Sequence, residues 1–158
     1  MTPFTPSALG SLLAALTLSI GPIAPAAAQG PAPVPPVRTG SAMVHLGSFT
    51  NDLHAAKMAL KVGTAMRQQG ASVVLFLDRE GVRLADTRQP LTLVYGDGDS
   101  FEKMYDAFVA AGGTVLVCPH CAHEAGMSAA TLRKGAHLAA DAPELAKAIL
   151  AADRVIDY

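Results

Sequence analysis

The chain has 158 residues, a length that allows one domain of ordinary size. Hydrophobic residues make up 51% of it and charged residues 16%, which favours a folded globular protein over a disordered or fibrous one. The formal net charge is −1, with acidic and basic residues interleaved along the sequence. Because no basic stripe is present to bind phosphates, nucleic acid is not an expected partner.

The N-terminal segment differs from the rest because residues 1–28 contain no charged side chain. The apolar run 9–20 is too short to span a bilayer core of roughly 30 Å, and Ala26-Ala27-Ala28 has the small-x-small form that signal peptidase accepts. We therefore predict a signal peptide over 1–28, cleaved after Ala28, and a periplasmic or secreted protein with no membrane span after cleavage. The leader lacks the usual basic start, so an uncleaved buried or anchoring helix is the alternative.

The next segment, residues 29–40, contains four prolines and two glycines and predicts a solvated, polyproline-like linker. The folded domain is expected over 41–158. It begins with a short strand at 42–46 and a helix that starts after Asp52 and stops at Gly70. The residues expected on the buried face of this helix are Ala55, Met58, Ala59, Val62 and Met66.

The middle of the domain opens with a continuous apolar run at 73–77, typical of a parallel strand covered on both faces. Glu80-Gly81 predicts a turn, with a brief extension at 82–85 and a further short strand at 91–95. Asp99 and Glu102 have the N-cap and N3 spacing of a second helix, which Gly112-Gly113 ends.

The last third places a strand, 114–117, directly before the turn Cys118-Pro119-His120-Cys121, with helical patterns at 122–126 and 129–134. A final helix begins at 141–144, and Val155-Ile156 is expected as a closing strand. Alternating strands and helices predict an α/β domain, a three-layer sandwich with a mostly parallel sheet of four to five strands.

The cysteine turn is the expected centre of chemistry. In an open α/β sheet, reactive groups gather at the carboxyl ends of strands, where helix N-termini point their free N–H groups. A helix N-terminus favours thiolate over thiol, and the thiolate is the nucleophile. Cys118 and Cys121 are therefore the candidate catalytic residues. His120 and His123 are auxiliary candidates that would hydrogen-bond Cys118 or raise its acidity, although solvated positions on the helix surface fit them equally well.

Other interpretations of the turn remain open on the residues alone. Cys118 could be an inert buried cysteine at a strand end. Cys-Pro-His-Cys is also the redox motif of strongly oxidising thioredoxin-fold proteins. However, only residues 122–158 follow the motif, and their sole proline, Pro143, looks like a helix start rather than the cis-proline that this fold needs.

A metal site at the turn is the third alternative, with Cys118, Cys121 and His123, and His120 between them, as sulfur and nitrogen ligands for zinc or copper. Four ligands from one tight turn are geometrically difficult. The more distant histidines that could complete such a site are His45, His54 and His137. Of these, His45 is expected to be an ordinary core or edge residue. Covalent haem needs a histidine where Ala122 stands. Because a four-ligand site in one turn is also difficult, we expect no cofactor and no metal.

Residues 115–126 resemble the cysteine segment of the DsrE/DsrF/TusD-like sulfur-transfer family, in which a strand ends in the cysteine and a short helix follows to a glycine eight residues on. Residues 74–82 resemble the family's second strand and its "eGV" turn, and 101–113 fit its helix before the cysteine strand. Downstream, Gly126, Gly135, Leu145 and Val155-Ile156 fit the pattern. The resemblance covers about residues 42–158.

This resemblance implies that Cys118 occupies the position of the sulfur-carrying cysteine, which receives a persulfide and passes it to a partner's thiol. Cys121 has no fixed family role. The implied partners are a sulfur donor and acceptor, either a protein or a small thiol, and further copies of the chain in a trimer or hexamer. The predicted export to an oxidising space would also permit a Cys118–Cys121 disulfide.

The leading hypothesis is therefore a persulfide relay in the cell envelope. Two alternatives stand beside it: thiol–disulfide exchange by Cys118 and Cys121, and a non-enzymatic oligomeric binding module with inert cysteines.

Overall fold

The structure is a computed structural model and describes residues 40–158. The predicted leader, and the predicted linker up to Thr39, lie outside the described residues. Within the described range, no helix combines the length and hydropathy needed to cross a bilayer.

One five-stranded sheet organises the described chain. Its strands are β1 (Ser41–Leu46), β2 (Ser72–Leu77), β3 (Thr114–Val117), β4 (Ala136–Leu138) and β5 (Arg154–Asp157), in the spatial order β4-β3-β2-β1-β5. Every neighbouring pair of these strands is parallel. The helices are α1 (Leu53–Gln68), α2 (Phe101–Ala110), α3 (Pro119–Glu124) and α4 (Ala142–Leu150), with short 3₁₀ helices η1 (Arg79–Ala85) and η2 (Ala129–Thr131).

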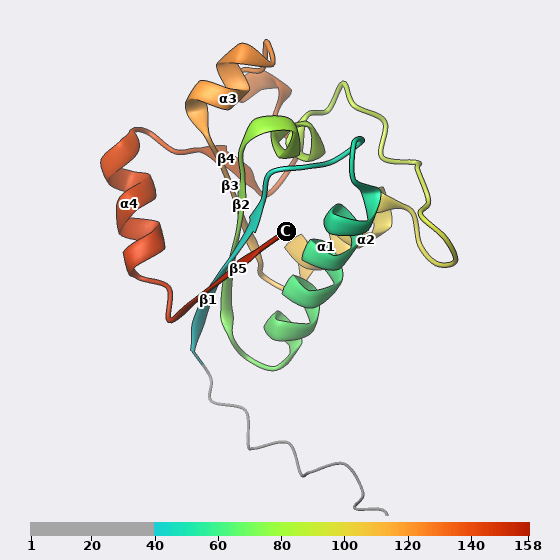
Figure 1. The fold of residues 1–158 in the computed structure, drawn as a ribbon, viewed down its shortest axis with the longest axis horizontal. Helices are drawn as coiled ribbons and strands as arrows, with labels where there is room; N and C mark the ends of the chain where they lie inside the picture. The colour runs from blue at the N-terminus through green and yellow to red at the C-terminus, as the bar shows by residue number, and fades with distance from the viewer. Residues whose placement is uncertain (1–39) are drawn as a thin grey trace, which may run out of the picture. The chain divides into compact units, whose positions relative to one another are not determined.

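The three predicted layers are present. Figure 1 shows α1 and α2 on one face of the sheet and α4 on the other. Successive strand residues alternate between these faces. The larger core lies under α1 and α2 and includes Val44, Leu75, Val115 and Phe108. A smaller cluster of Met43, Phe76, Leu116 and Ala139 packs against Leu145 and Ala148 of α4.

The helix starts follow from capping residues, one of which differs from the prediction. The Asp52 carboxylate accepts from the Ala55 N–H at 3.0 Å and starts α1. Asp99 does not cap α2; Ser100 does, its hydroxyl accepting from the Lys103 N–H at 3.3 Å. The Asp99 carboxylate instead pairs with the Lys103 ammonium at 2.7 Å.

The inward face of α1 is also rotated from the predicted one. Its buried residues are Ala55, Ala56, Ala59, Leu60 and Gly63, whereas Met58 and Val62 are half-buried. Gly63 explains the rotation, because a Cβ there would lie 3.1 Å from the Phe108 ring of α2. The close approach of the two helices therefore occurs at Gly63.

Three local predictions in the second half of the chain are wrong. Residues 79–85 form η1 instead of a turn and strand extension, and 91–95 form no strand. The Leu91 and Leu93 carbonyls accept instead from Glu102 and Phe101 at 2.9 and 3.0 Å, so the segment satisfies the first N–H groups of α2. The strand that completes the five-stranded sheet is β4, in place of the strand predicted at 91–95. Of the helix predicted at 129–134, only the 3₁₀ helix η2 forms.

Candidate functional site

Cys118 lies where β3 meets α3, at the carboxyl edge of the sheet, as the sequence predicts. Its backbone N–H donates to the Leu77 carbonyl at 2.9 Å, which extends the pairing of β2 and β3 by one residue. The residue is then the N-cap of α3, with Pro119 in the first turn, where proline's fixed φ suits a helix start. The Cys118 side chain packs against the small cluster on the α4 side of the sheet.

The two cysteines form a close thiol pair. Both are free and half-buried, and their Sγ atoms lie 2.8 Å apart. This separation exceeds the bond length of a disulfide, about 2.05 Å. Cys118 Sγ accepts from the Cys121 thiol and from the Cys121 backbone N–H, the latter at 3.4 Å. Both donors of Cys121 therefore converge on the Cys118 sulfur.

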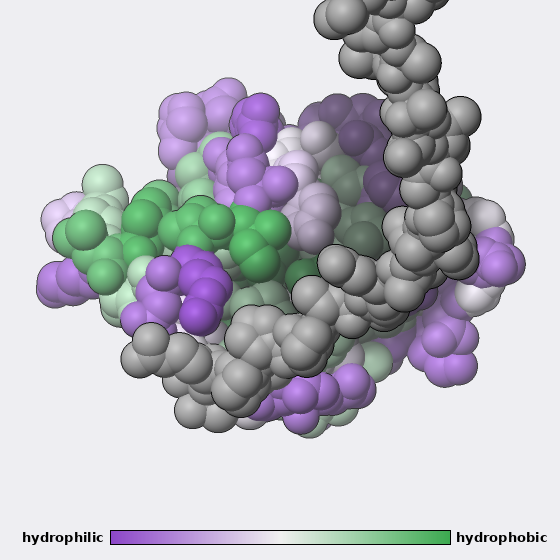
Figure 2. All heavy atoms as spheres, turned by 60° about the horizontal axis from the view of Figure 1, so that its bottom comes forward, coloured by the Kyte–Doolittle hydropathy of each residue, from purple (hydrophilic) through white to green (hydrophobic). Residues whose placement is uncertain are grey.

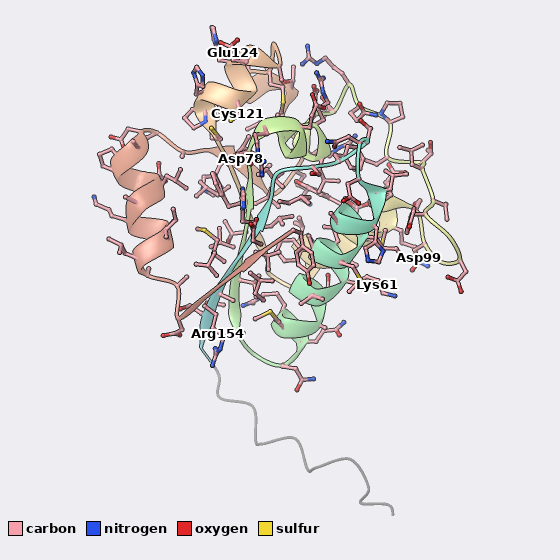
Figure 3. The ribbon with its side chains drawn as sticks, in the orientation of Figure 1. Lys61, Asp78, Asp99, Cys121, Glu124 and Arg154 are labelled. Atoms are coloured by element: carbon pink, nitrogen blue, oxygen red, sulfur yellow. The ribbon has the colours of Figure 1, made fainter. Side chains whose placement is uncertain are left out.

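Cys121 is arranged to keep its proton. Burial raises the pKa of the Cys121 thiol, and its hydrogen bond to Cys118 and the nearby Asp78 carboxylate raise it further. A hydrogen bond from the Arg79 backbone acts in the opposite direction on the pKa. Figure 3 shows Asp78 and Cys121 at the same end of the sheet. The ranking of Cys118 above Cys121 as the nucleophile stays a prediction.

The turn after β2 positions the Arg79 backbone. Arg79 has φ 43°, a left-handed conformation that is uncommon outside glycine. Two residues later the chain passes so close to β1 that a Cβ at Gly81 would lie 2.1 Å from the Leu46 carbonyl oxygen. Glycine is therefore required at 81, and the "eGV" segment holds η1 against the end of β1, beside the cysteines.

His45 also lies at this edge of the sheet, in a more specific setting than the ordinary core or edge position that the sequence predicts. Its Nδ1 lies 2.6 Å from Asp157 Oδ1, and its Nε2 lies 2.9 Å from Asp78 Oδ1. The second contact lacks hydrogen-bond geometry. The ring stacks on Phe76 at 5.4 Å between centroids. His45 thus lies between two carboxylates, Asp78 directly after β2 and Asp157 at the end of β5. The positions of both residues at strand ends are the sequence signal for this cluster.

The two auxiliary histidines lie on the outer side of α3. His120 is exposed and borders the hollow next to Cys121. The His123 side chain is 86% exposed and its Nδ1 lies 3.5 Å from Glu124 Oε1. Within residues 40–158 we observe no contact between His123 and either cysteine. The auxiliary roles of both histidines therefore stay predictions.

A hollow of about 370 Å³ opens beside Cys121, a size that suits a small molecule. Arg79, Glu80, Arg83, His120, Cys121, Glu124 and Ala125 line it. Glu80 and Arg83, three residues apart on η1, pair with each other at 2.9 Å. In the described part of the chain, no group of three His, Cys, Asp or Glu side chains is placed to hold a metal ion.

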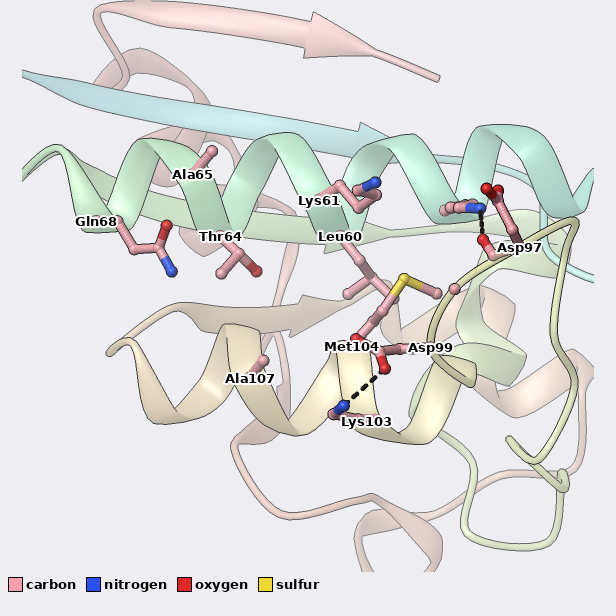
Figure 4. A pocket seen from close by; sticks show the side chains of 12 residues that line it. Leu60, Lys61, Thr64, Ala65, Gln68, Asp97, Asp99, Lys103, Met104 and Ala107 are labelled. Carbon is pink, nitrogen blue, oxygen red and sulfur yellow. Dashed lines mark hydrogen bonds and ion pairs between the residues drawn. The ribbon is translucent and has the colours of Figure 1, made fainter.

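A second hollow, about 290 Å³, lies between α1 and α2 (Figure 4). Two of its lysines are engaged by the chain itself. The Lys57 ammonium donates to the Tyr95 and Asp97 carbonyls at 2.7 and 2.8 Å, and Lys103 pairs with Asp99. Neither cysteine lines this hollow, so the cysteine edge remains the candidate site.

Comparisons with known proteins identify the fold and the family of the chain. Two solved structures share the fold: the ychN protein from E. coli has a TM-score of 0.60 and 22% identity, covering 77% of this chain and 100% of that one. The MTH1491 protein from Methanobacterium thermoautotrophicum, of unknown function, has a TM-score of 0.54 and 10% identity, covering 75% and 99%. No curated protein matches the chain. The model of the DsrE/DsrF-like family matches residues 45–158, and the chain belongs to that family.

Proposed function

We propose that this protein is a sulfur carrier in which Cys118 takes up sulfur as a persulfide and passes it to an acceptor thiol. The observation that carries the proposal is the position of the Cys118 sulfur at the carboxyl edge of the sheet, where it accepts from two donors of Cys121. In the loading step the Cys118 thiolate attacks the outer sulfur of a donor persulfide, and the donor leaves as a thiolate. Membership of the DsrE/DsrF-like family supports this chemistry.

The test uses Cys121→Ser, which leaves Cys118 as the only cysteine because the chain has two. Serine retains a hydroxyl donor at that place. After incubation with glutathione persulfide and removal of excess reagent, intact-mass measurement is expected to show a gain of about 32 Da, one sulfur atom. Cys118→Ala is expected to show no such gain. Equal sulfur uptake by Cys118→Ala would overturn the carrier role.

Thiol–disulfide exchange is the second candidate function, and the 2.8 Å separation of the two sulfurs favours it. It predicts a defined reduction potential for the pair, measured in glutathione redox buffers, and loss of exchange activity in Cys121→Ser. A pair that neither exchanges with disulfides nor takes up sulfur would instead support the binding module with inert cysteines.

We also propose that copies of the chain associate through the surface formed by α4 and β5. Large apolar side chains are exposed there, with Ile149 40%, Leu150 86% and Val155 55% accessible. Figure 2 shows hydrophobic surface gathered in a band on one side of the molecule. Such exposure is typical of an interaction surface. Leu150→Lys is expected to lower the molar mass in light scattering, and an unchanged mass would contradict the proposal.

The location in the cell envelope stays a proposal that rests on the sequence of the first 28 residues. Mass measurement of the protein recovered from its native host is expected to give a mature N-terminus at Gln29. A chain that keeps its leader would contradict cleavage.

A further inference from the structure

The second thiol of the site bears on what happens to sulfur after Cys118 has accepted it. Cys121 Sγ lies 2.8 Å from Cys118 Sγ, so the sulfur that would hold the cargo is already in contact with another thiol. A cysteine that serves only as a carrier does not need such a neighbour. The geometry therefore calls for a role of Cys121 within the same reaction.

We propose that Cys121 attacks the Cys118 persulfide at its inner sulfur and releases the carried sulfur as hydrosulfide, leaving a Cys118–Cys121 disulfide. This inference rests on the proposed function of Cys118 as a sulfur carrier. It adds an activity, the reduction of small persulfides to hydrosulfide, and assigns Cys121 as the residue that discharges the carrier.

The reaction balances without a further reagent. The Sγ–Sγ bond between the cysteines forms, and the bond between Cys118 Sγ and the outer sulfur breaks. The outer sulfur leaves with two electrons as hydrosulfide, while the two cysteines together become oxidised to the disulfide. The proton on Cys121 passes to the departing sulfur. A second turnover requires an external dithiol to reduce the disulfide.

Two arguments place the attack on the inner sulfur. The Cys121 sulfur need approach by only about 0.8 Å to reach disulfide bonding distance. The leaving group also favours the inner sulfur. Attack there releases hydrosulfide, whereas attack on the outer sulfur would release the Cys118 thiolate. Because hydrogen sulfide is a stronger acid than an alkyl thiol, hydrosulfide is the better leaving group. Holding attacker and target together in one short turn makes the step effectively unimolecular.

The surroundings of Cys121 supply its activation. The Cys121 thiol donates toward Cys118, so its proton already points at the site of the persulfide. When the anionic persulfide takes that proton, a neutral electrophile and a thiolate arise in contact. The hydrogen bond from the Arg79 backbone then stabilises the Cys121 thiolate. This hydrogen bond lowers the pKa of Cys121, whereas burial raises it. The adjoining hollow, which Cys121 lines, has room for a small persulfide next to the pair.

The experiment uses the full chain, reduced and held without oxygen, with glutathione persulfide as the probe. Wild type is expected to release about one hydrosulfide per chain and to end about 2 Da lighter than the reduced protein, as a disulfide. Cys121→Ser is expected to keep the gain of about 32 Da and to release no hydrosulfide above the Cys118→Ala blank. Arg154→Ala, altered at the opposite end of the sheet (Figure 3), is the control and should behave as wild type.

The outcomes separate this inference from the carrier role. If Cys121→Ser takes up sulfur and wild type holds it equally long, the carrier stands and the discharge is overturned. Wild type that becomes a disulfide without releasing hydrosulfide also overturns it, because direct oxidation then explains the bond. If Cys121→Ser takes up no sulfur, the carrier role itself fails. Because wild type alone reports both mass and hydrosulfide, the test survives a variant that does not fold.

Discussion

Gly81 is the position where one added methyl group should disturb the cysteine site without touching it. In Gly81→Ala the new Cβ would lie 2.1 Å from the Leu46 carbonyl oxygen, whereas a carbon–oxygen contact needs about 3.3 Å. The 3₁₀ helix η1 must therefore move from the end of β1 by about 1 Å. Because the obstructing atom belongs to the backbone, no side-chain rotation relieves the clash, and we expect a loss of about 1–3 kcal/mol in the free energy of unfolding.

The same displacement of η1 should also change the environment of the Cys121 thiol. Arg79 precedes Gly81 by two residues, and its backbone hydrogen bond lowers the pKa of Cys121. A shift of about 1 Å is enough to break a hydrogen bond, so the pKa of Cys121 should rise further. Alkylation of Cys121 near neutral pH should then be slower in Gly81→Ala than in wild type, because the thiolate is the reacting species.

Gly126→Ala is the matched control. Gly126 has φ 66°, but no atom lies within 4 Å of a Cβ placed there, so this variant carries backbone strain of about 1 kcal/mol and no clash. Urea unfolding and residue-resolved alkylation by mass spectrometry compare the two. The reasoning is refuted if Gly81→Ala loses no more stability than Gly126→Ala, or if it keeps the wild-type alkylation rate at Cys121.

Three further predictions concern titrating groups. Burial raises the pKa of Tyr105 to about 12, above its unfolded value of about 10, so its contribution to stability is full below pH 10 and falls by about 2 kcal/mol as the pH rises to 12. Urea unfolding of Tyr105→Phe should lack that fall, and an identical alkaline slope would contradict the assignment. The hydrogen bond from Arg88 lowers the pKa of buried Asp86, so its stabilisation is present above the unfolded pKa and lost as the pH falls through the folded one. Asp86→Asn should cost about 1–3 kcal/mol at pH 7 and less at pH 3, measured by urea unfolding; equal costs at both pH values would argue against the ion pair. Cys118→Ala removes a contact that raises the pKa of Cys121, so alkylation of Cys121 at pH 7.5 should be faster than in wild type, and a slower reaction would contradict the coupling.

The sequence predicts those parts of the fold whose signal is local and strong. The runs at β2 and β3 are largely buried, and their continuous apolar pattern identifies them. Asp52 and Asp141 start α1 and α4 as expected, because a capping carboxylate acts within three residues of itself. The position of Cys118 follows from the same patterns, since β3 ends directly before it.

The parts that the sequence does not predict depend on contacts between distant segments. β4 has three residues and exists because β3 offers it a free edge, so no periodicity marks it. Residues 91–95 have strand-like composition, but their carbonyls meet the start of α2 before any strand can pair with them. His45 acquires its two carboxylate neighbours only when β5 and the end of β2 lie on either side of β1.

The unequal cover of the two sheet faces determines where the molecule opens most readily. Helix α4 has no fully buried residue, and the cluster beneath it is small, whereas α1 and α2 each contribute several buried side chains. Segments with few buried apolar contacts undergo local unfolding at a lower free energy than the rest of a domain. Amide protons of α4 will therefore exchange with solvent well before those of α1. Because Cys118 packs against the small cluster on the α4 side, each local unfolding of α4 is expected to increase the solvent exposure of its side chain.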